Sequence, residues 1–341
     1  MDAVETVDAP PARTRALVGE LSQRLGGERH ALSERKVAVL EERDAAACTL
    51  LLRRAAPASG DAVTKSAATA EGVAAAAVLR WEQTRQDAPG AAPAAQVADD
   101  DAAPVATAEL LADDPADGRP LLEAAERAVA HRGGGQLHVW AYDDAMAQVI
   151  AQADYRPVRR LLLQQRGLEQ APAAARWPQG VTVSPFRPGQ DEDALLAVNN
   201  RAFATHPEQG GLDRQDLAAR TAAPWFDSED VRCAWRDGVL LGFHWLKRHP
   251  VGAAEVPGRE PLGEVYVLAV DPQAQGLGLG RALLRHGLSH LRTRGCVEAV
   301  LFVEADDLAA GLYASEGFAT RRAHTCYARE LGAEAPSPRG P

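Results

Sequence analysis

Lysine is scarce in this chain of 341 residues, which has only three lysines and a formal net charge of −10 at pH 7. Proteins that bind nucleic acid usually carry a basic patch, and this balance suggests none. No apolar run reaches the roughly 20 residues that cross a bilayer, and the opening residues MDAVETVDAP are acidic rather than signal-like. We therefore expect a monomer with small-molecule substrates, without a nucleic-acid or membrane partner.

Paired cysteines are also missing. The four cysteines are Cys48, Cys233, Cys296 and Cys326. They form no C-x-x-C pair, which argues against both a zinc site and a disulfide framework. His206, His244 and His249 have no H-x-x-x-H spacing, so we interpret them as core or loop residues. These absences predict no metal and a reducing, cytoplasmic setting.

Phenylalanine is absent from the first half: all six lie at or after Phe186, whereas residues 55–118 are crowded with Ala, Asp and Pro. The segment 89–104, PGAAPAAQVADDDAAP, has almost nothing to bury and is predicted to be a loop or disordered. Residues 1–54 contain stretches that favour helices, namely ARTRALVGELSQRL and RKVAVLEERDAAACTLLLRR. Segment 169–180, EQAPAAARWPQG, is typical of a linker.

The most informative stretch is QGLGLGRALL at 275–284, which follows EVYVLAVDP. Residues 264–270 are mostly β-branched, aromatic or aliphatic, so they predict a buried strand that Asp271-Pro272 ends. From Arg281 onward the leucines recur at helical spacing. The glycines therefore occupy a strand-to-helix turn, where unpaired backbone N–H groups and the helix dipole suit a phosphate.

Three phosphate-binding patterns compete for this turn. A P-loop needs Lys-Ser or Lys-Thr after the last glycine, but Arg281-Ala282 follows. A dinucleotide fingerprint needs G-x-G-x-x-G, but the spacing here is G-x-G-x-G. The third pattern, Gln/Arg-x-x-Gly-x-Gly/Ala, is matched by Gln275, Gly278 and Gly280. A glycine-rich turn without a ligand is the plain alternative.

The chain also contains an internal repeat. Residues 139–160 align without gaps with the stretch from Phe302, which pairs Asp143-Asp144 with Asp306-Asp307. Upstream, 108–129 resembles the strand, turn and helix that begin at Glu264. The first copy has a shorter turn without the glycines and carries Ile150 where the second has Tyr313. Two tandem domains with a degenerate first copy are therefore predicted, although chance similarity between two βα segments is the alternative.

The third glycine pattern resembles that of the general N-acetyltransferase (GNAT) superfamily, and the resemblance covers about residues 180–332. It implies an α/β (α+β) fold of two GNAT-like domains, each with a mixed central sheet flanked by helices. It further implies that the turn cradles the pyrophosphate of acetyl-CoA, and that the backbone of Leu268 and Val270 bonds the pantetheine arm. The ending LYASEGF matches the superfamily's Leu-Tyr-x-x-x-Gly-Phe, which places Tyr313 near the thioester sulfur.

Amide formation needs a base for the attacking amine and an acid for the departing thiolate. Glu264 begins the central strand, on the same side as Tyr266 by alternation. It is the candidate base, with a solvated strand-end charge as the alternative. Tyr313 is the candidate acid.

Four further stretches narrow the resemblance: VNNRAFATHPEQGG, PWFDSEDV, LLGFHWLKRHP and GEVYVLAVDPQAQGLGLG. In this order they resemble the mycothiol synthases, tandem GNATs that acetylate the cysteinyl amine of a glucosaminyl-inositol. The resemblance implies that Glu264 is the base and Tyr313 the acid. It places substrate contacts on Glu208, Lys247, Glu264 and Phe302. It places coenzyme contacts on Leu268, Ala269, Val270, Gln275, Gly276, Leu277, Gly278, Leu279, Gly280, Arg281, Asp306, Asp307, Leu308, Ala309, Ala310, Gly311 and Leu312.

The sequence departs from that family in three places. Phe302 replaces a tyrosine, and Asp306-Asp307 replaces the usual Asp-Asn. The alanine-rich stretch EGVAAAAVLRW at 71–81 lacks the carboxylate-bearing segment that the family uses to contact substrate. A GNAT for another small amine and a non-catalytic acyl-CoA-binding protein therefore remain alternatives. The expected boundaries are a helical extension at 1–60, a degenerate GNAT-like domain at 61–168, a linker at 169–180, a catalytic GNAT domain at 181–332 and a disordered tail at 333–341.

Overall fold

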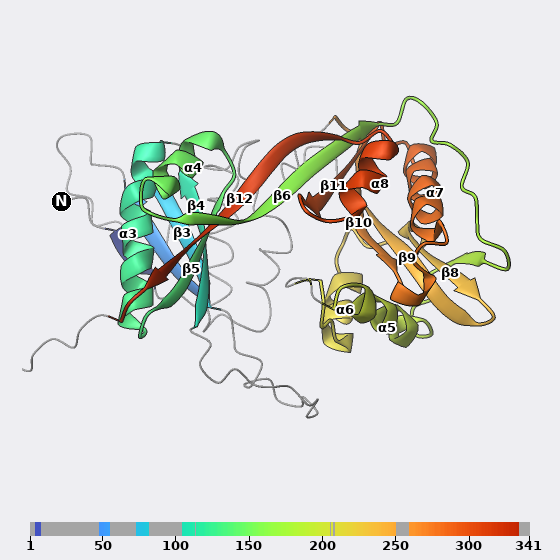
Figure 1. Ribbon diagram of the computed structural model, residues 1–341, viewed down its shortest axis with the longest axis horizontal. Coiled ribbons are helices and arrows are strands. Elements are labelled where there is room, and N and C mark those ends of the chain that lie inside the picture. The colour runs from blue at the N-terminus through green and yellow to red at the C-terminus, as the bar shows by residue number, and fades with distance from the viewer. Residues whose placement is uncertain are drawn as a thin grey trace, which may run out of the picture. The chain divides into compact units, whose positions relative to one another are not determined.

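A computed structural model describes residues 4–7, 48–54, 73–81, 104–112, 114–204, 206, 209–249 and 259–333 (Figure 1). The chain divides into two compact units. The first unit comprises Met1–Leu161, Ala254–Pro257 and Ala323–Pro341, and the second comprises Leu162–Ala253 and Gly258–Arg322. Each unit has its own apolar core.

The sheet of the first unit follows the strand order β1-β2-β3-β4-β5-β12. Its strands are β1 (Val4–Val7), β2 (Cys48–Arg54), β3 (Val73–Trp81), β4 (Val105–Ala112), β5 (Gly135–Ala141) and the second half of β12 (Ala319–Leu331). Only β4 and β5 are parallel among these neighbours; the other pairs are antiparallel. The parallel pair requires a crossover, and helix α3 (Pro115–His131) supplies it.

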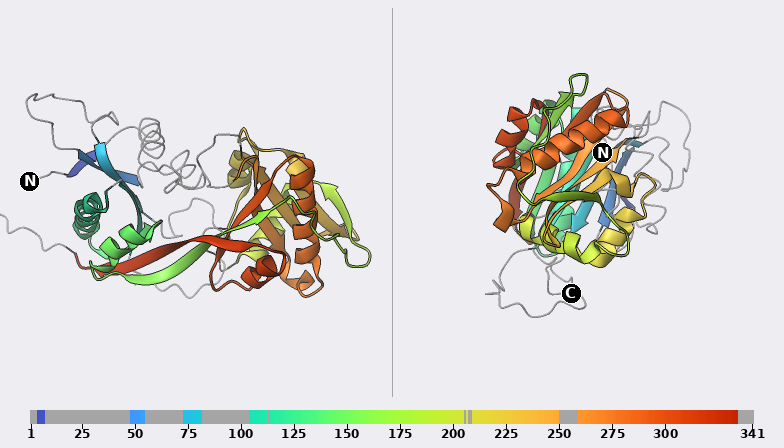
Figure 2. Two further views of the ribbon diagram at one scale, coloured as in Figure 1. Left: turned by 90° about the horizontal axis from the view of Figure 1, so that it is seen from above. Right: turned by 90° about the vertical axis from the view of Figure 1, so that its right-hand side faces the viewer.

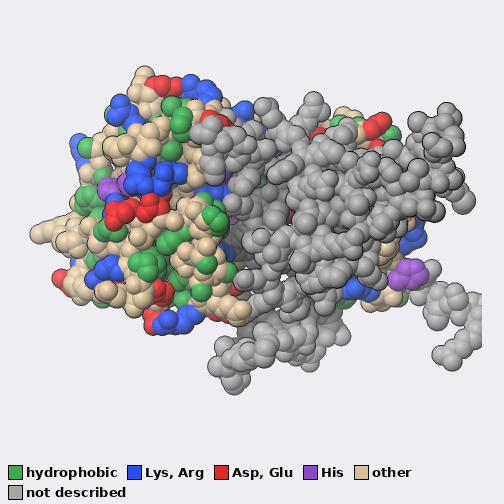
Figure 3. Space-filling view, turned by 180° about the vertical axis from the view of Figure 1, so that it is seen from behind, with side chains coloured by type: hydrophobic (Ala, Val, Ile, Leu, Met, Phe, Trp, Pro, Cys, Tyr) green, Lys and Arg blue, Asp and Glu red, His purple; other side chains and the backbone are tan. Residues whose placement is uncertain are grey.

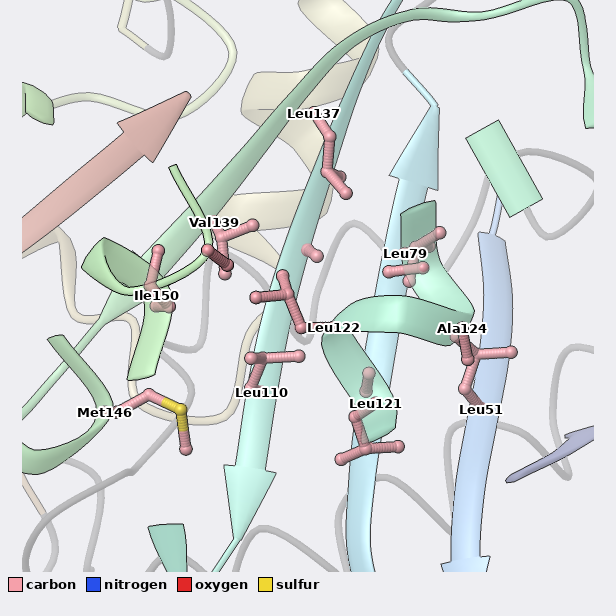
Figure 4. Packing of buried hydrophobic residues seen from close by; sticks show 14 of the residues in the cluster. Leu51, Leu79, Leu110, Leu121, Leu122, Ala124, Leu137, Val139, Met146 and Ile150 are labelled. Atoms are coloured by element: carbon pink, nitrogen blue, oxygen red, sulfur yellow. The ribbon is translucent and has the colours of Figure 1, made fainter. Parts of the chain in front are cut away.

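The core of the first unit lies between this sheet and the helices α3 and α4 (Asp144–Ala151). Leu121 and Leu122 of α3 and Ile150 of α4 are fully buried against the sheet. In Figure 4, Met146 and Ile150 lie beside Val139 of β5, and Leu121 and Leu122 lie over the central strands. Alanine-rich β3 contributes small side chains to this core, because Ala75 and Ala77 have no exposed area and belong to it.

The sheet of the second unit follows the order β6-β11-β10-β9-β8-β7. Its strands are β6 (Arg156–Gly167), β7 (Thr182–Pro185), β8 (Val231–Arg236), β9 (Val239–Arg248), β10 (Leu262–Val270) and β11 (Glu298–Glu304). As in the first unit, one central pair is parallel, β10 with β11, and a helix makes the crossover.

Helices cover both faces of the second sheet (Figure 2). Helix α7 (Leu279–Thr293) packs Leu284, Leu288 and Leu291 against one face, together with Tyr313 of α8 (Ala309–Ser315). Helices α5 (Glu192–Ala202) and α6 (Arg214–Thr221) pack on the other face, against Phe243 and Trp245 of β9. We call these the α7 face and the α5 face.

The expected helical extension at 1–60 is wrong where the structure describes it. Val4–Val7 and Cys48–Arg54 are strands that pair with each other, and the remainder of 1–60 lies outside the described residues. The run CTLLLRR is apolar throughout, and such a short run does not distinguish a buried strand from a helix by its periodicity. Pairing with β1 and β3 on either side makes it a strand.

The contact-based division also differs from the expected boundaries. It falls between Leu161 and Leu162, inside strand β6, rather than in the expected linker at 169–180. Residues 323–331, expected in the catalytic domain, belong to the first unit, where Thr325–Leu331 pair with β5. Strands β6 and β12 thus each belong partly to one unit and partly to the other. The amino-acid composition does not change where a continuous strand is divided in this way, so the sequence did not indicate these boundaries.

Candidate functional site

Strands β10 and β11 pair only where they begin. Their register covers Leu262, Gly263 and Glu264 opposite Glu298, Ala299 and Val300. On its other side, β10 stays paired with β9 as far as Val270, with a bulge between Val265 and Val267. A bulge bends its strand and increases the local twist, so β10 diverges from β11 after Glu264. The predicted backbone contacts, Leu268 to Val270, lie on this diverging part.

The predicted glycine turn follows directly. A short 3-10 turn, η5 (Pro272–Ala274), leads through Gln275 to Gly276 and Gly278, which have φ of 76° and 79°. Gly278 is the N-cap of α7 and therefore supplies no side-chain cap to the first-turn N–H groups. A Cβ built on either glycine would meet nothing within 4 Å. The positive end of the helix dipole thus faces open space, which is the arrangement that suits a phosphate.

The turn lies close to the end of β10 and to α8. A Cβ on Gly280 would approach Val270 Cγ2 at 3.6 Å and Leu312 Cδ2 at 3.8 Å. The three predicted groups of coenzyme contacts, on β10, in the turn and on α8, therefore come together. The start of α8 is ordered by Asp307, whose carboxylate accepts from the N–H of Ala309 at 2.7 Å.

Arg281 was expected to contact the coenzyme, but its side chain is already engaged. Its guanidinium donates to Ser315 Oγ at 2.9 Å and to the Glu316 carboxylate. Arg285 also binds Glu316, through Nε at 2.9 Å. Burial would raise the pKa of Glu316, but the hydrogen bonds from Arg285 and Arg281 lower it overall. These contacts tie α7 to α8 and leave only the backbone of Arg281 facing the turn.

Tyr313 lies on the α7 face, where its ring packs edge-on against Phe318 with centroids 5.9 Å apart. Burial raises the pKa of the Tyr313 phenol well above its usual value, and the Asp307 carboxylate raises it further. The phenol is therefore protonated at neutral pH. Its hydroxyl makes no hydrogen bond to any of the described residues, so its proton is not committed elsewhere.

Glu264 lies on the opposite, α5 face, directly across from Lys247 in the β9–β10 register. Its side chain is 12 % exposed, and Oε2 is 2.9 Å from Nε2 of His249. Lys247 is buried, with Nζ 5.3 Å from the ring centroid of Trp225. The predicted base and one predicted substrate ligand are thus neighbours. Both lie where β10 leaves β11. Because they are on the α5 face and Tyr313 is on the α7 face, they lie on the opposite side of the diverging strands from Tyr313.

Aromatic rings surround this pair of charges. Trp225 packs edge-on against Tyr266 at 5.2 Å, and Trp245 contacts Tyr266 at 5.7 Å and Phe226 at 5.6 Å. Phe302, the third predicted substrate contact, is half-buried on β11. Glu208, the remaining one, lies outside the described residues.

Sequence reasoning did not include His249 in the site. His249 could have been found, because alternation along β9 places 245, 247 and 249 on one face. The position of Trp225 depends on the loop before η4 (Ser228–Asp230), which has no periodicity to read.

Other side chains of interest lie away from this site. His244, on the α7 face of β9, contacts His286 of α7 at 3.3 Å. The described part of the chain holds no group of three His, Cys, Asp or Glu that could bind a metal ion. Within that same part, no helix is long and apolar enough to cross a bilayer. Basic and acidic side chains are interspersed on the described surface in view in Figure 3.

Comparisons with known proteins agree with this geometry. The Acetyltransferase (GNAT) family pattern matches residues 197–318. A mycothiol acetyltransferase of Thermomonospora curvata is 47 % identical over 225 residues, which cover 65 % of this chain and 69 % of that protein. One from Streptomyces avermitilis is 42 % identical over 242 residues, or 69 % of this chain and 75 % of the relative.

Two solved structures share the fold across nearly the whole chain. A tandem GNAT protein from the clavulanic acid biosynthesis pathway superposes with a TM-score of 0.64 at 18 % identity, covering 98 % of this chain and 100 % of that one. A GCN5-related N-acetyltransferase from Sphaerobacter thermophilus gives a TM-score of 0.62 at 18 % identity, covering 98 % of each chain. The predicted fold, two tandem GNAT-like domains, is therefore confirmed.

Proposed function

Because this chain belongs to the mycothiol acetyltransferase family, we propose that it transfers the acetyl group of acetyl-CoA to the cysteinyl amine of cysteinyl-glucosaminyl-inositol. The observation that carries the proposal is the uncapped start of α7 beside two diverging strands, with Glu264 on one face and Tyr313 on the other. We assign the reaction to the second unit and propose that the first unit is not catalytic.

Acetyl-CoA would bind on the α7 side of the diverging strands. The backbone N–H groups from Gln275 to Arg281 offer donors to the pyrophosphate. The edge of β10 from Leu268 to Val270 offers backbone groups to the amides of the pantetheine arm. The start of α8, Asp306 to Leu312, would cover the other side. The thioester would then reach the point where β10 leaves β11, next to Glu264.

The acceptor ammonium loses two protons on becoming an amide, and the departing thiolate gains one. An α-amino group has a pKa near 8, so much of the acceptor arrives protonated and must lose one proton before it attacks. Glu264 takes that proton directly or through a water and passes it to solvent. The neutral amine nitrogen then bonds to the thioester carbonyl carbon and gives its second proton to solvent, and the carbon–sulfur bond breaks. Tyr313, held protonated by its raised pKa, delivers its proton to the departing thiolate and is reprotonated from solvent.

The acceptor would be recognised on the α5 face. It carries an amine, a thiol and two hydroxyl-rich rings, with no carboxylate or phosphate. Lys247 supplies donors for hydroxyls, and Glu208 is proposed to supply acceptors. The Trp225 ring, which lies beside Lys247, offers an apolar face to a sugar ring. Phe302 keeps a ring on β11 but has no hydroxyl to donate.

A steady-state comparison of two acceptors tests this assignment. We expect Lys247→Ala and Glu208→Ala each to lower kcat/KM for the full precursor by about ten- to a hundredfold, because each removes a hydrogen bond to a charged group. The KM for acetyl-CoA should stay unchanged. Free cysteine lacks the rings, so its weak turnover should be insensitive to both changes and serves as the control substrate.

The outcomes separate the alternatives. If free cysteine is used as well as the full precursor, the pocket does not recognise the sugar and the chain acts on another small amine. If acetyl-CoA binds but no amine is acetylated, the chain is an acyl-CoA-binding protein without this activity.

A further inference from the structure

A buried histidine holds the proposed base. Strand β9 ends at Arg248, and the chain continues in register, since the N–H of His249 donates to the carbonyl of Leu262 at 2.9 Å. This backbone bond fixes the ring beside β10. Nε2 of His249 lies 2.9 Å from Oε2 of Glu264, and the His249 side chain is only 2 % exposed. The contact therefore joins two side chains that water barely reaches.

The contact uses only one of the two carboxylate oxygens. At neutral pH a carboxylate can only accept hydrogen bonds, so the short contact requires Nε2 to carry the proton. No described residue bonds to Oε1 of Glu264. The arrangement thus leaves one oxygen available to receive a proton and fixes the direction in which it points.

Few other described groups could hold this carboxylate. Among the described residues, the titratable groups on this face of β9 and β10 are Glu264, Lys247, His249 and Tyr266. The described segment packed over that face contributes Trp225 and Phe226, which offer no acidic or basic group. The contact from His249 is therefore the described hydrogen bond that orients the Glu264 carboxylate.

We propose that His249 is a positioning residue for the acetyl transfer: its Nε2–H holds Oε2 of Glu264 and so directs Oε1 toward the acceptor amine. This inference rests on the proposed function, in which Glu264 is the base. His249 itself does not touch the reacting atoms. Its loss should therefore lower the rate of acetyl transfer rather than the binding of acetyl-CoA.

The test measures kcat and both KM values in the full chain, with the cysteinyl-glucosaminyl-inositol acceptor. We expect His249→Ala to lower kcat by about ten- to a hundredfold and to leave the KM for acetyl-CoA unchanged. His249→Gln, whose amide can still donate, should restore most of kcat. If the alanine variant does not fold, His249→Asn takes its place, because its shorter amide stops short of Glu264 and should behave in the same way.

The matched control is His290→Gln, in the same unit. His290 also pairs with a buried carboxylate, Asp230, at 2.7 Å, but on the α7 face. It should cost stability and leave kcat unchanged. An unchanged kcat in His249→Ala, or an equal fall of kcat in His290→Gln, would overturn the inference. Glu264→Gln separates the two claims: full activity in that variant refutes the proposed base, whatever His249 does.

Discussion

Helix α3 of the first unit and helix α7 of the second make the same crossover between parallel strands, but they begin in opposite ways. The N-cap of α3 is Asp114, whose carboxylate accepts from the N–H of Ala116 at 2.9 Å, and Pro115 removes another donor. The N-cap of α7 is Gly278, which has no side chain. The first helix therefore satisfies its positive end with the chain's own anion, whereas the second has no side-chain cap.

The space beside the start of α3 is filled, whereas the space beside the start of α7 is open. A Cβ on Gly118 of α3 would meet the Met146 side chain at 2.7 Å, so α4 packs directly on α3 (Figure 4). A Cβ on Gly280 of α7 would meet its neighbours only at 3.6 Å and beyond. Met146 aligns with Ala309 in the repeat, and Ile150 with Tyr313. The larger Met146 side chain thus fills the first unit where the second has Ala309.

The central strands show a third difference. In the first unit β4 and β5 pair over five residues, from Val105 to Glu109, whereas β10 and β11 pair over three. In each unit a glutamate occupies the last paired position. Glu109 is buried and accepts from the Tyr142 hydroxyl at 2.6 Å. Glu264 has one oxygen without a bond to the described residues. In the first unit, internal side chains cap the crossover helix, fill the space beside it and bond the glutamate. The same topology can therefore lose a binding site without any change of fold.

The largest expected effect comes from giving α7 the cap that α3 has. Gly278→Asp places a carboxylate at the helix start, where it competes with the pyrophosphate, and should abolish acetyl-CoA binding in a calorimetric titration of the full chain. Gly295→Asp is the matched control. Gly295 also has a positive φ, 90°, and open space around it, but it follows the other end of α7. It should bind acetyl-CoA normally; equal loss in both variants would show that strain alone is responsible.

Substitution of Glu264 and substitution of Glu109 should differ strongly in their effects on turnover. Glu264→Gln should lower turnover by about 10²–10⁴-fold, the usual effect of removing a positioned base, with the deficit greatest at low pH, where more of the amine is protonated. Tyr313→Phe should slow thiolate departure and leave the KM for acetyl-CoA nearly unchanged. Glu109→Gln in the first unit keeps a partner for Tyr142 and should leave turnover intact. A loss of activity in Glu109→Gln would contradict a silent first unit.

Acid should weaken the second unit through its buried histidines. Burial holds the pKa of His244 well below its usual value, and burial also lowers the pKa of His286. Below about pH 6.5, the unfolded chain binds protons at these two sites that the folded chain does not, so the free energy of unfolding falls as the pH drops. Denaturant unfolding at pH 5.5 and 7.5 should show a smaller fall in His244→Leu. The exposed His131→Leu of the first unit should retain the full fall.

The smallest effect is expected in the first unit. Asp114→Ala removes the α3 cap and should lower the free energy of unfolding by about 1 kcal/mol. It should not create a second acetyl-CoA site, because Met146 still fills the space beside Gly118. A second site appearing in titrations of this variant would mean that the cap alone silences the first unit.

Local patterns predicted the second unit well. The strand expected at 264–270 is β10, Leu262–Val270. The helix expected from Arg281 onward is α7, Leu279–Thr293. Each is fixed by short-range signals: β-branched runs, the Asp-Pro stop and the glycine turn. The sequence did not predict that Glu264 and Lys247 face each other across β10 and β9. The pairing of these strands depends on a bulge that the sequence does not mark.

The rest of the architecture depends on long-range contacts. The runs CTLLLRR and VAAAAVLRW are strands because neighbouring strands pair with them, although alanine alone favours a helix. Residues 325–331 pair with β5, nearly two hundred positions earlier in the chain, and no local signal reports such a partner. The contact between His249 and Glu264 joins two strands in the same way.

Hydrogen–deuterium exchange of the full chain with and without acetyl-CoA tests the central claim most directly. The claim is that the second unit alone binds the coenzyme, because its crossover helix begins uncapped. We predict that acetyl-CoA slows exchange of the backbone amides at 275–285 and leaves those at 114–122 unchanged. Protection at 114–122, or none at 275–285, would contradict it.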